Sequence, residues 1–378
     1  MTAPGRTALV HDWLTGFRGG EQVLLSLARL FPEAPIYTLL HVKGSLPPEL
    51  EKRTIRTSFI GKLPFAARLY RHYLPLFPFA VRGLDVRGFD LVISSSHCVA
   101  KSVTPGPDAR HISYCHTPMR YVWDRFDDYF GPARMGRVGS GLLRVMAEGL
   151  RAFDVATAHH VHQYVANSGT VAARIRHFYG RDATVIEPPV DTDFFTPGPE
   201  GAPPEYDLVV SALVPYKRID LAIDAARITG RRLLVVGSGP EERRLRAGAG
   251  RNVEFLGSAD RDRLLGLYRG CRALILPGVE DFGIVVAEAL ACGRPALVNA
   301  QGGGAEIVNR GEFGQTFVEP TGEAVARALQ QLGSNRFARL ELRKRAETFS
   351  RTRFEARFRA VVEGPAGSWP ETTRPRQA

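Results

Sequence analysis

The sequence ALILPGVEDFGIVVAEALACGRPALVN occupies residues 273–299 and has the clearest pattern in the chain. The apolar run Ala273–Leu276 predicts a buried strand, Val285–Cys292 a helix, and Pro295–Asn299 a second strand. Neighbouring strands that are connected through a helix run parallel to each other, because such a long crossover brings the chain back to the end of the sheet at which it started. The stretch therefore predicts one strand–helix–strand unit of a parallel sheet.

The same alternation extends toward the N-terminus of this stretch. It predicts three further strands, at Asp207–Ser211, Arg232–Val236 and Val253–Leu256. It also predicts three helices, at Ile219–Arg227, Glu241–Ala247 and Asp260–Arg269. Strands that alternate with helices of about ten residues indicate a parallel sheet covered on both faces. Residues 206–348 are therefore expected to form a doubly wound α/β domain.

The first half of the chain begins with a similar pattern. Thr7–Asp12 predicts a strand, Gly16–Gly20 a turn and Glu21–Phe31 an amphipathic helix, an order typical of nucleotide-binding α/β domains. Later runs predict strands at Ile36–Leu40, Leu91–Ser94, His111–Cys115 and Tyr164–Ala166, and a helix at Val171–Phe178. Residues 1–187 are therefore expected to form another doubly wound α/β domain. The predicted fold class is α/β, with two Rossmann-like domains facing a cleft.

Prolines mark the boundary between the two domains. Pro188, Pro189 and four more prolines before residue 205 cannot continue a helix or a central strand. Residues 188–205 are therefore expected to be a linker. A helical pattern near the C-terminus predicts a last helix over residues 349–363. The tail at 364–378 is rich in Pro, Thr and Arg and is expected to be flexible.

Composition excludes several classes of protein. With 44% apolar residues among 378, the chain can bury enough surface to fold, so intrinsic disorder is not expected. No apolar run reaches the roughly 18 residues of a membrane-spanning helix. The N-terminus lacks the pattern of a secretory signal, and four separate cysteines without a Cys-x-x-Cys pair suit the cytoplasm. The net charge of +11 favours anionic partners.

Two acids are the best candidates for binding an activated sugar. Glu280 follows a predicted strand, at the carboxyl end where parallel sheets bind ligands. Its carboxylate and the backbone N–H groups of Asp281, Phe282 and Gly283 are suited to sugar hydroxyls. Glu288, in the following helix, can accept two hydrogen bonds from a ribose diol, and the positive end of the helix suits a diphosphate. On these two acids alone, an equal alternative is that Glu280 is a solvated acid in a loop and Glu288 an ordinary glutamate of a helix.

A basic pair, Lys217 and Arg218, follows the predicted strand Asp207–Ser211. A lysine ammonium is a compact charge that suits a diphosphate. The alternative is a solvated charge flanking the next helix.

Five segments, in matching order, resemble the retaining GT-B glycosyltransferases of family 4. Glu280 and Glu288, within EDFGIVVAEALACGRP, are similar to the E-x7-E signature of that family. The other four segments are SYCHTPMRYVWD (Ser113–Asp124), VANSGTVAARIRHFYG (Val165–Gly180), VIEPPVDTDFF (Val185–Phe195) and SALVPYKRIDLAIDA (Ser211–Ala225). The resemblance implies transfer of a hexose from a nucleotide sugar to a saccharide hydroxyl, with retention at the sugar. It also implies that residues 1–187 form the acceptor-side domain and residues 206–348 the domain that binds the nucleotide sugar. Overall likeness favours mannose from GDP-mannose.

The resemblance also implies roles for single residues. Lys217 is expected to stabilise the leaving diphosphate, Glu280 to position the sugar and His116 to act at the sugar and acceptor side. Residues expected to contact the donor are Gly19, Gly20, Arg218, Gly237, Gly239, Asp281, Phe282, Gly283 and Glu288. The glycine-rich stretch Gln301–Glu306 is expected to close the same pocket. Ala212 stands where the family usually has an arginine, and Arg218 is a candidate for supplying that charge.

No metal or other cofactor is expected. Asp191 and Asp193 form a D-x-D pair, which holds a divalent metal in another glycosyltransferase fold. Here the pair lies on the expected linker without an adjoining glycine loop, so it is interpreted as structural. In the family the last helix usually crosses back to the first domain, and the same is expected of residues 349–363.

The segment Lys52–Leu84 carries seven Lys or Arg and no acid. Aromatic residues interleave with these charges: Phe59, Phe65, Tyr70, Tyr73, Phe77 and Phe79. Such a segment suits an anionic membrane or single-stranded nucleic acid, or it packs into a core with a basic rim. Because no nucleic-acid motif accompanies it, the membrane is favoured and no nucleic-acid partner is expected.

The expected partners are therefore a nucleotide-sugar donor, a saccharide or lipid-linked acceptor and an anionic membrane surface. The enzyme is expected in the cytoplasm, peripheral on the inner face of the membrane, in bacterial surface polysaccharide synthesis. Two other classes remain as alternatives. One is another GT-B enzyme, such as a nucleotide-sugar epimerase or a phosphorylase. The other is a non-catalytic basic adaptor for membranes or nucleic acid.

Overall fold

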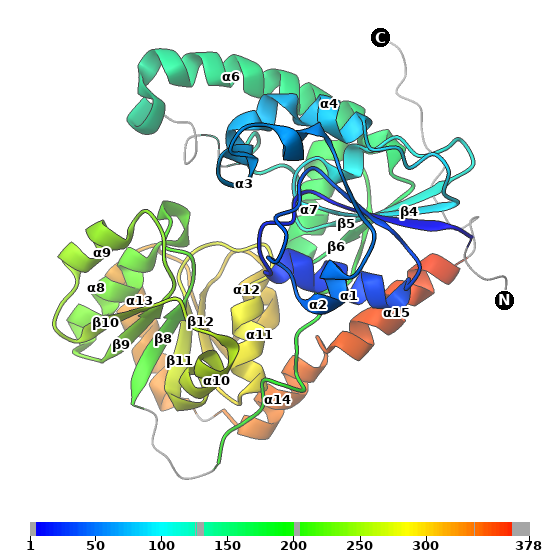
Figure 1. The fold of residues 1–378 in the computed structure, drawn as a ribbon. Helices are drawn as coiled ribbons and strands as arrows, with labels where there is room; N and C mark the ends of the chain where they lie inside the picture. Colours follow the sequence, from blue (N-terminus) through cyan, green and yellow to red (C-terminus); the bar gives the residue numbers. More distant parts are fainter. Residues whose placement is uncertain (1–4, 125, 127–131, 200–204, 336, 365–378) are drawn as a thin grey trace. The chain divides into compact units, whose positions relative to one another are not determined.

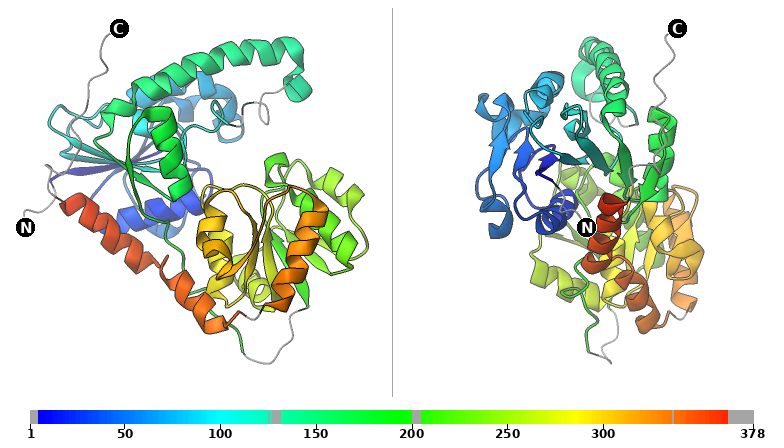
Figure 2. Two further views of the ribbon diagram at one scale, coloured as in Figure 1. Left: turned by 180° about the vertical axis from the view of Figure 1, so that it is seen from behind. Right: turned by 90° about the vertical axis from the view of Figure 1, so that its right-hand side faces the viewer.

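The computed structural model describes residues 5–124, 126, 132–199, 205–335 and 337–364. The chain divides into two compact units (Figures 1 and 2), each described by itself below. The first unit comprises the chain up to Glu187 together with the chain from Phe354 onward, and the second comprises Pro188–Arg353. The expected flexible tail lies, beyond Gly364, outside the described residues, as do residues 200–204 of the expected linker.

The first unit contains a seven-stranded parallel sheet of order β3-β2-β1-β4-β5-β6-β7. The strands are β1 Thr7–His11, β2 Ile36–Thr38, β3 Ile55–Thr57, β4 Leu91–Ser96, β5 Arg110–Cys115, β6 Gln163–Ala166 and β7 Ala183–Val185. The order reverses between β1 and β4, and doubly wound sheets bind ligands at the carboxyl ends of strands beside such a reversal.

The second unit contains a six-stranded parallel sheet of order β10-β9-β8-β11-β12-β13. The strands are β8 Tyr206–Val210, β9 Leu233–Val236, β10 Val253–Gly257, β11 Cys271–Leu276, β12 Ala296–Asn299 and β13 Gly314–Phe317. Its order reverses between β8 and β11. The predicted fold class, two doubly wound α/β sheets, is confirmed.

Helices cover both faces of each sheet (Figure 1). Those of the first unit are α1 Gly19–Leu30, α2 Pro48–Glu51, α3 Ala66–Leu69, α4 Phe77–Arg82, α6 Pro132–Ala156, α7 Gly169–Tyr179 and α15 Arg351–Glu363. Those of the second are α8 Ile219–Thr229, α9 Glu242–Gly248, α10 Arg261–Gly270, α11 Ile284–Ala291, α12 Gly303–Ile307, α13 Gly322–Ser334 and α14 Arg339–Glu347.

Neighbouring strand residues enter separate cores, because successive side chains of a strand point to opposite faces. In β1, Leu9 packs with the α1 core, whereas Val10 packs with the α4 core. In β8, Leu208 packs with α11 and Val209 with α8. This two-sided burial explains why the central strands read as continuous apolar runs.

The last helix, α15, belongs to the first unit from Phe354 onward. Its Phe354 and Phe358 are buried in the same core as Leu9 and stack on each other at 5.9 Å between ring centroids. The guanidinium of Arg110 donates to the Val361 carbonyl at 2.7 Å and so ties the helix end to β5.

Some elements lie where no element was predicted. The edge strands β3 and β7 are short and largely solvent-accessible, so they lack the apolar run that marks the central strands. Helix α6 contains Gly136, Gly139, Gly141 and Gly149, which weaken a helical pattern because glycine is a poor helix former. No helix among the described residues combines the length and apolarity needed to span a bilayer. All four cysteines are buried.

Candidate active site

The strongest candidate site of the second unit lies at the carboxyl ends of β8 and β11. Lys217 ends a single 3₁₀ turn, Pro215–Lys217, that follows β8, and Glu280 lies in the loop after β11. The Lys217 ammonium contacts Glu280 Oε1 directly, and both side chains keep some exposure, 17% and 14%. The structure thus brings together one cation and one anion that were predicted from separate segments.

Glycine allows the two loops to approach each other this closely. A Cβ on Gly278 would lie 2.8 Å from the Lys217 Cα atom, a distance that real Cβ atoms do not show. A Cβ on Gly302 would lie 2.4 Å from the Glu280 carbonyl oxygen, and the Gly303 N–H donates to that oxygen at 2.9 Å. The glycine-rich stretch expected to close the pocket therefore supports the backbone that carries Glu280.

The loop after β9 is also in tight contact with the loop after β8. Gly237 has φ +130°, and a Cβ there would overlap the Ser211 carbonyl oxygen. A Cβ on Gly239 would lie 2.3 Å from the Leu213 carbonyl oxygen. Both positions therefore require glycine for packing, whether or not a nucleotide binds there.

Helix α11 begins directly behind Glu280. Gly283 precedes its first residue at φ +93°, in the left-handed region that glycine adopts readily. The buried Phe282 ring packs against Phe349, with 5.5 Å between the ring centroids, and anchors this turn. Its side chain is therefore part of the hydrophobic core. The first N–H groups of a helix lack a carbonyl four residues earlier within the helix, and here the N–H of Val286 donates to the Gly283 carbonyl at 2.9 Å.

Glu288 has a different environment from that of Glu280. Its carboxylate accepts a hydrogen bond from the buried Tyr268 hydroxyl at 2.7 Å. Burial raises the pKa of Glu288 to about 7, against lowering by Tyr268 and Arg261. Within the described chain, no hydrogen bond or ion pair joins Glu288 to Lys217 or Glu280. Lys217, Glu280 and Glu288 were all expected to contact the nucleotide sugar. Lys217 and Glu280 contact each other, whereas Glu288 is held separately by Tyr268.

Arg218, the candidate second cation, is partly neutralised. Its guanidinium donates to both carboxylate oxygens of Asp220 at 3.0–3.2 Å. Its backbone is left-handed at φ 52°, where it joins the 3₁₀ turn to α8. Ala212 carries no charge, so Arg218 is the candidate for the second cation, and its guanidinium is already paired with Asp220.

Asp191 of the D-x-D pair forms salt bridges. Its Oδ2 accepts from Arg261 at 2.6 Å and lies 3.4 Å from Arg351. In the part of the chain that the structure describes, no group of three or more His, Cys, Asp or Glu residues is arranged to hold a metal ion. Asp193 is exposed in the same segment.

The candidate site of the first unit lies at the carboxyl ends of β1, β4 and β5. His116 follows β5, and its Nε2 lies 2.8 Å from the Ser95 hydroxyl at the end of β4. Burial, followed by the nearby imidazoles of His97 and His11, holds the pKa of His116 well below its ordinary value. His116 is therefore a neutral imidazole at physiological pH, suited to hydrogen bonding rather than to ion pairing.

Of the two glycines near the N-terminus, Gly20 lies beside this histidine, whereas a Cβ on Gly19 would meet nothing within 4 Å. Gly19 and Gly20 are the first residues of α1, whereas the sequence predicted a turn that ends at Gly20. A Cβ on Gly20 would lie 3.5 Å from His11 Cε1 and 3.8 Å from His116 Nε2. The start of α1 at Gly20 therefore lies close to His11 and His116.

Sequence reasoning missed several residues of this half-site. Asp12, fully buried, accepts hydrogen bonds from four consecutive backbone N–H groups, those of residues 97–100, at 2.6–3.0 Å. It thereby shapes the loop after β4, which carries His97. The visible signal was the polar pair His11-Asp12 at the carboxyl end of a predicted strand, which was read only as the end of that strand.

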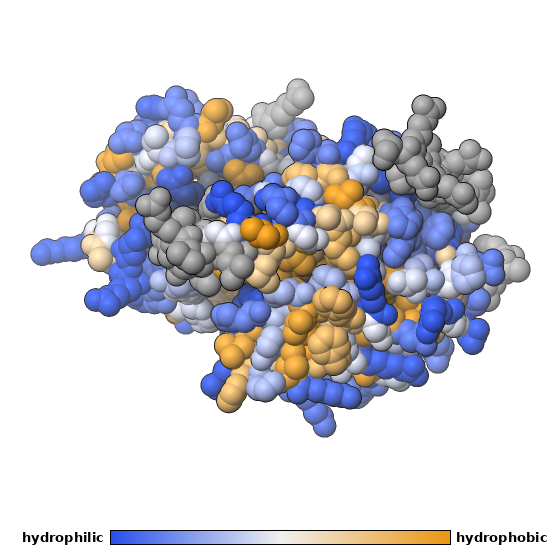
Figure 3. Space-filling view, turned by 90° about the horizontal axis from the view of Figure 1, so that it is seen from above, coloured by the Kyte–Doolittle hydropathy of each residue, from blue (hydrophilic) through white to orange (hydrophobic). Residues whose placement is uncertain are grey.

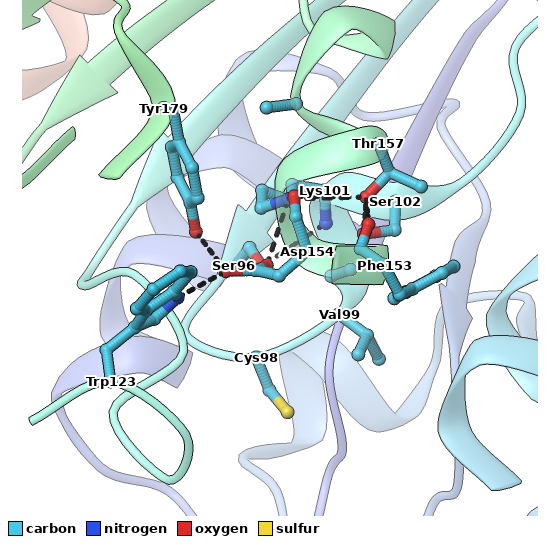
Figure 4. A network of polar contacts seen from close by, with 12 residues as sticks. Ser96, Cys98, Val99, Lys101, Ser102, Trp123, Phe153, Asp154, Thr157 and Tyr179 are labelled. Atoms are coloured by element: carbon cyan, nitrogen blue, oxygen red, sulfur yellow. Dashed lines mark hydrogen bonds and ion pairs between the residues drawn. The ribbon is translucent and has the colours of Figure 1, made fainter. Parts of the chain in front are cut away.

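A buried polar network supports the segment after His116 (Figure 4). The Asp154 carboxylate pairs with the Lys101 ammonium at 3.0 Å, and both side chains are buried. Its Oδ2 also accepts from Trp123 Nε1 and from the Tyr179 hydroxyl, each at 2.8 Å. Thr157 and Ser102 extend the network through a hydroxyl pair at 2.7 Å. One carboxylate therefore joins the loop after β4, the segment after β5 and helix α7.

The basic segment Lys52–Leu84 divides into buried and exposed aromatic residues. Tyr70 and Phe77 are buried in the core, and Tyr73 is half-buried. Large apolar side chains that remain exposed are Phe59, Phe65, Leu69, Leu76 and Phe79, with Phe65 at 76% and Phe79 at 65%. Phe65 has a left-handed backbone, φ 51°, which costs free energy for a bulky residue. Part of this segment therefore packs into the core, and part of it is exposed to solvent.

Two family models match the chain consecutively. The model described as Glycosyltransferase Family 4 matches residues 17–194, and the model described as Glycosyl transferases group 1 matches residues 193–353. Together they cover both units.

Curated relatives match over shorter stretches. A D-inositol 3-phosphate glycosyltransferase of Mycobacteroides abscessus is 35% identical over 141 residues, 32% of each chain. A GDP-mannose-dependent alpha-(1-6)-phosphatidylinositol dimannoside mannosyltransferase of Mycobacterium tuberculosis is 33% identical over 154 residues, 39% of this chain and 38% of the relative. An O-antigen chain mannosyltransferase C of Escherichia coli is 30% identical over 162 residues, 40% and 42%. The matches span about a third to two fifths of these relatives.

Solved structures match over nearly the whole fold. HepE of Anabaena, in complex with UDP and glucose, has a TM-score of 0.71 at 16% identity, covering 96% of this chain and all of that one. Sucrose-phosphate synthase of Thermosynechococcus elongatus has a TM-score of 0.70 at 17% identity, covering 94% and 98%.

Proposed function

Because the chain belongs to the family 4 glycosyltransferases of GT-B fold, we propose that it is a retaining hexosyltransferase with a nucleotide-sugar donor. The observation that carries this proposal is the contact between Lys217 and Glu280 at the strand reversal of the second unit. A cation for the diphosphate and a carboxylate for sugar hydroxyls are there held side by side. The donor proposed is GDP-mannose, since two of the relatives are mannosyltransferases.

The second unit binds the donor. The ammonium of Lys217 and the N–H groups at the start of α11 stabilise the charge that develops on the leaving diphosphate. Glu280 positions the hexose, and Glu288 accepts hydrogen bonds from the ribose hydroxyls. Catalysis then depends on orientation and on electrostatic stabilisation of the leaving group, without a metal ion. Attack and departure on the same face of the sugar give retention.

The first unit binds the acceptor. His116, a neutral imidazole, can hydrogen-bond a hydroxyl at the reacting centre. The exposed apolar and basic side chains of Lys52–Leu84 fit an anionic lipid surface, because apolar side chains enter the headgroup region while cations meet lipid phosphates. Viewed from above (Figure 3), apolar patches alternate with hydrophilic ones on this face of the molecule. A saccharide or lipid-linked glycan on the cytoplasmic side of a membrane is therefore the proposed acceptor, in surface polysaccharide synthesis.

A panel of nucleotide sugars, each incubated with and without a polyprenyl-linked saccharide acceptor, tests the proposal. We expect GDP-mannose to give an α-linked mannosyl product only when the acceptor is present. An altered nucleotide sugar formed without acceptor would identify an epimerase instead. Absence of any donor turnover, together with no thermal shift on adding nucleoside diphosphates, would identify a non-catalytic adaptor.

A further inference from the structure

Three imidazoles lie together at the carboxyl ends of β1 and β4 and just after β5. The ring centroids of His11, His97 and His116 are 6.1–6.5 Å apart, and the rings meet at steep angles. Only two of them share a hydrogen-bonding partner. The Ser95 hydroxyl oxygen lies 3.1 Å from His11 Nδ1 and 2.8 Å from His116 Nε2. His97 instead faces Asp12, with its Nδ1 3.2 Å from a carboxylate oxygen.

A hydroxyl between two imidazole nitrogens couples their protons. A serine hydroxyl carries one hydrogen, so it can donate to only one of the two nitrogens. For both contacts to be hydrogen bonds, the other nitrogen must donate to the serine oxygen. If His11 Nδ1 accepts the serine hydrogen, His116 Nε2 must therefore donate to the serine oxygen.

Glu21 sets the direction of this coupling. His11 Nε2 faces Glu21 Oε1 at 3.8 Å and makes no hydrogen bond within the described residues. A lone pair on Nε2 would face a carboxylate, so Nε2 carries the proton. A His11 ring whose one proton is on Nε2 has its lone pair on Nδ1, so Nδ1 accepts from the Ser95 hydroxyl.

The same backbone turn holds the carboxylate in place. Glu21 Oε2 accepts from the Arg18 N–H at 2.9 Å, at the start of α1. This hydrogen bond and the first-turn position favour the ionised carboxylate, because the helix N-terminus is positive. Gly20, in the same turn, packs against both imidazoles.

We infer that Glu21, His11 and Ser95 form a relay that holds His116 with its proton on Nε2 and leaves Nδ1 as a hydrogen-bond acceptor. Nδ1 of the partly exposed His116 makes no hydrogen bond within the described chain. It is therefore available to accept from a hydroxyl group. That this hydroxyl belongs to the transferred sugar or its acceptor rests on the proposed function. Glu21, His11 and Ser95 are positioning residues, since they act through His116.

The tautomer of His116 can be measured without any substrate. Two-bond proton–nitrogen correlation spectra of the full chain with ¹⁵N-histidine report which ring nitrogen carries the proton, and His116→Gln assigns the signal. We expect Nδ1 of His116 to be unprotonated and Nε2 protonated. The opposite assignment, or a charged His11 ring, would overturn the relay and leave the proposed function standing.

Two variants separate the relay from the surrounding packing. Ser95→Ala is expected to convert the single tautomer of His116 into a mixture, whereas His97→Gln, which removes the neighbouring imidazole outside the relay, is expected to leave it unchanged. A mixture in His97→Gln together with a single tautomer in Ser95→Ala would contradict the assignment.

Kinetics provide the second readout. Ser95→Ala is expected to lower kcat about tenfold with little change in the donor KM, the size of one lost hydrogen bond. Ser95→Thr, which keeps the hydroxyl, should recover most of the loss. If no variant and no wild-type chain transfers sugar, the proposed function fails while the tautomer measurement still decides the relay.

Discussion

The two units share one strand order but carry different chemistry at the point where that order reverses. In the first unit the reversal between β1 and β4 is surrounded by imidazoles and a hydroxyl. In the second, the reversal between β8 and β11 carries an ammonium and a carboxylate. The comparison teaches that the doubly wound sheet decides where a site lies, whereas the loop residues decide what the site can do.

The loops of the two units are also held by different means. In the first unit buried carboxylates, Asp12 and Asp154, collect hydrogen bonds from several segments. In the second unit glycines let one backbone pack directly on another, as at Gly278 and Gly302. Substitutions should therefore affect stability most in the first unit and turnover most in the second.

The largest expected effect is on stability, in the first unit. Asp154→Ala leaves the Lys101 ammonium buried without its carboxylate and should lower the free energy of unfolding by about 3–5 kcal/mol. Denaturation followed by tryptophan fluorescence measures it, since Trp13 and Trp123 lie in this unit. The control Asp182→Ala, which breaks an exposed pair with Arg176, should cost at most about 1 kcal/mol. Equal losses of unfolding free energy in the two variants would contradict the expected difference between a buried and an exposed ion pair.

The next effect is on turnover, in the second unit. Lys217→Ala should lower kcat about 10²–10³-fold, because one contact to the leaving group is lost. Arg218→Ala should cost less than about tenfold, since its guanidinium already pairs with Asp220. Steady-state kinetics with the preferred donor measure both. An equal loss in Arg218→Ala would identify this arginine as the second phosphate-binding cation.

Donor binding should depend on pH through Glu288. Its pKa of about 7, raised by burial, means that the carboxylate becomes protonated as pH falls, while a ribose diol needs the ionised acceptor. Nucleoside diphosphate affinity should therefore fall about tenfold between about pH 8 and about pH 6. Calorimetric titration of wild type and Glu288→Gln tests this, since the variant has no such titration. The same pH dependence in both chains would exclude Glu288 as its source.

A smaller effect is expected on membrane binding by the first unit. Arg68→Glu/Arg71→Glu should weaken association with vesicles containing anionic lipid by about tenfold or more, at about 1 kcal/mol per basic residue. Arg353→Glu/Arg359→Glu, with the same charge change on α15, should have little effect. Sedimentation with vesicles measures both. Unchanged binding in the first variant would favour the core-packing interpretation of Lys52–Leu84.

The smallest expected effect is that of chelation. Transfer activity should be the same with and without EDTA, because Lys217 and the start of α11 meet the diphosphate charge and Asp191 is engaged by Arg261. Loss of activity in EDTA that magnesium restores would instead assign Asp191 and Asp193 to a metal.

Much of the fold could be predicted because each central strand is buried on both faces and therefore reads as an apolar run. The exposed edge strands β3 and β7 could not, since a half-solvated strand lacks that run. The proximity of Lys217 and Glu280 could be predicted because each follows a recognisable strand of one parallel sheet. The pairing of Glu288 with Tyr268 could not, because both lie on helices with no local signal for the contact.

Periodicity and loop chemistry are local properties, so the amino-acid sequence was enough to identify the central strands of both sheets, several of their helices and the loops that carry charge. Only the tertiary structure decided that His11, Ser95 and His116 share one hydroxyl, although 84 and 21 positions separate Ser95 from the two histidines. Parallel pairing of β1 with β4 and of β4 with β5 aligns their carboxyl ends, and this register brings the three side chains together. Contacts of that kind depend on the packing of the whole sheet.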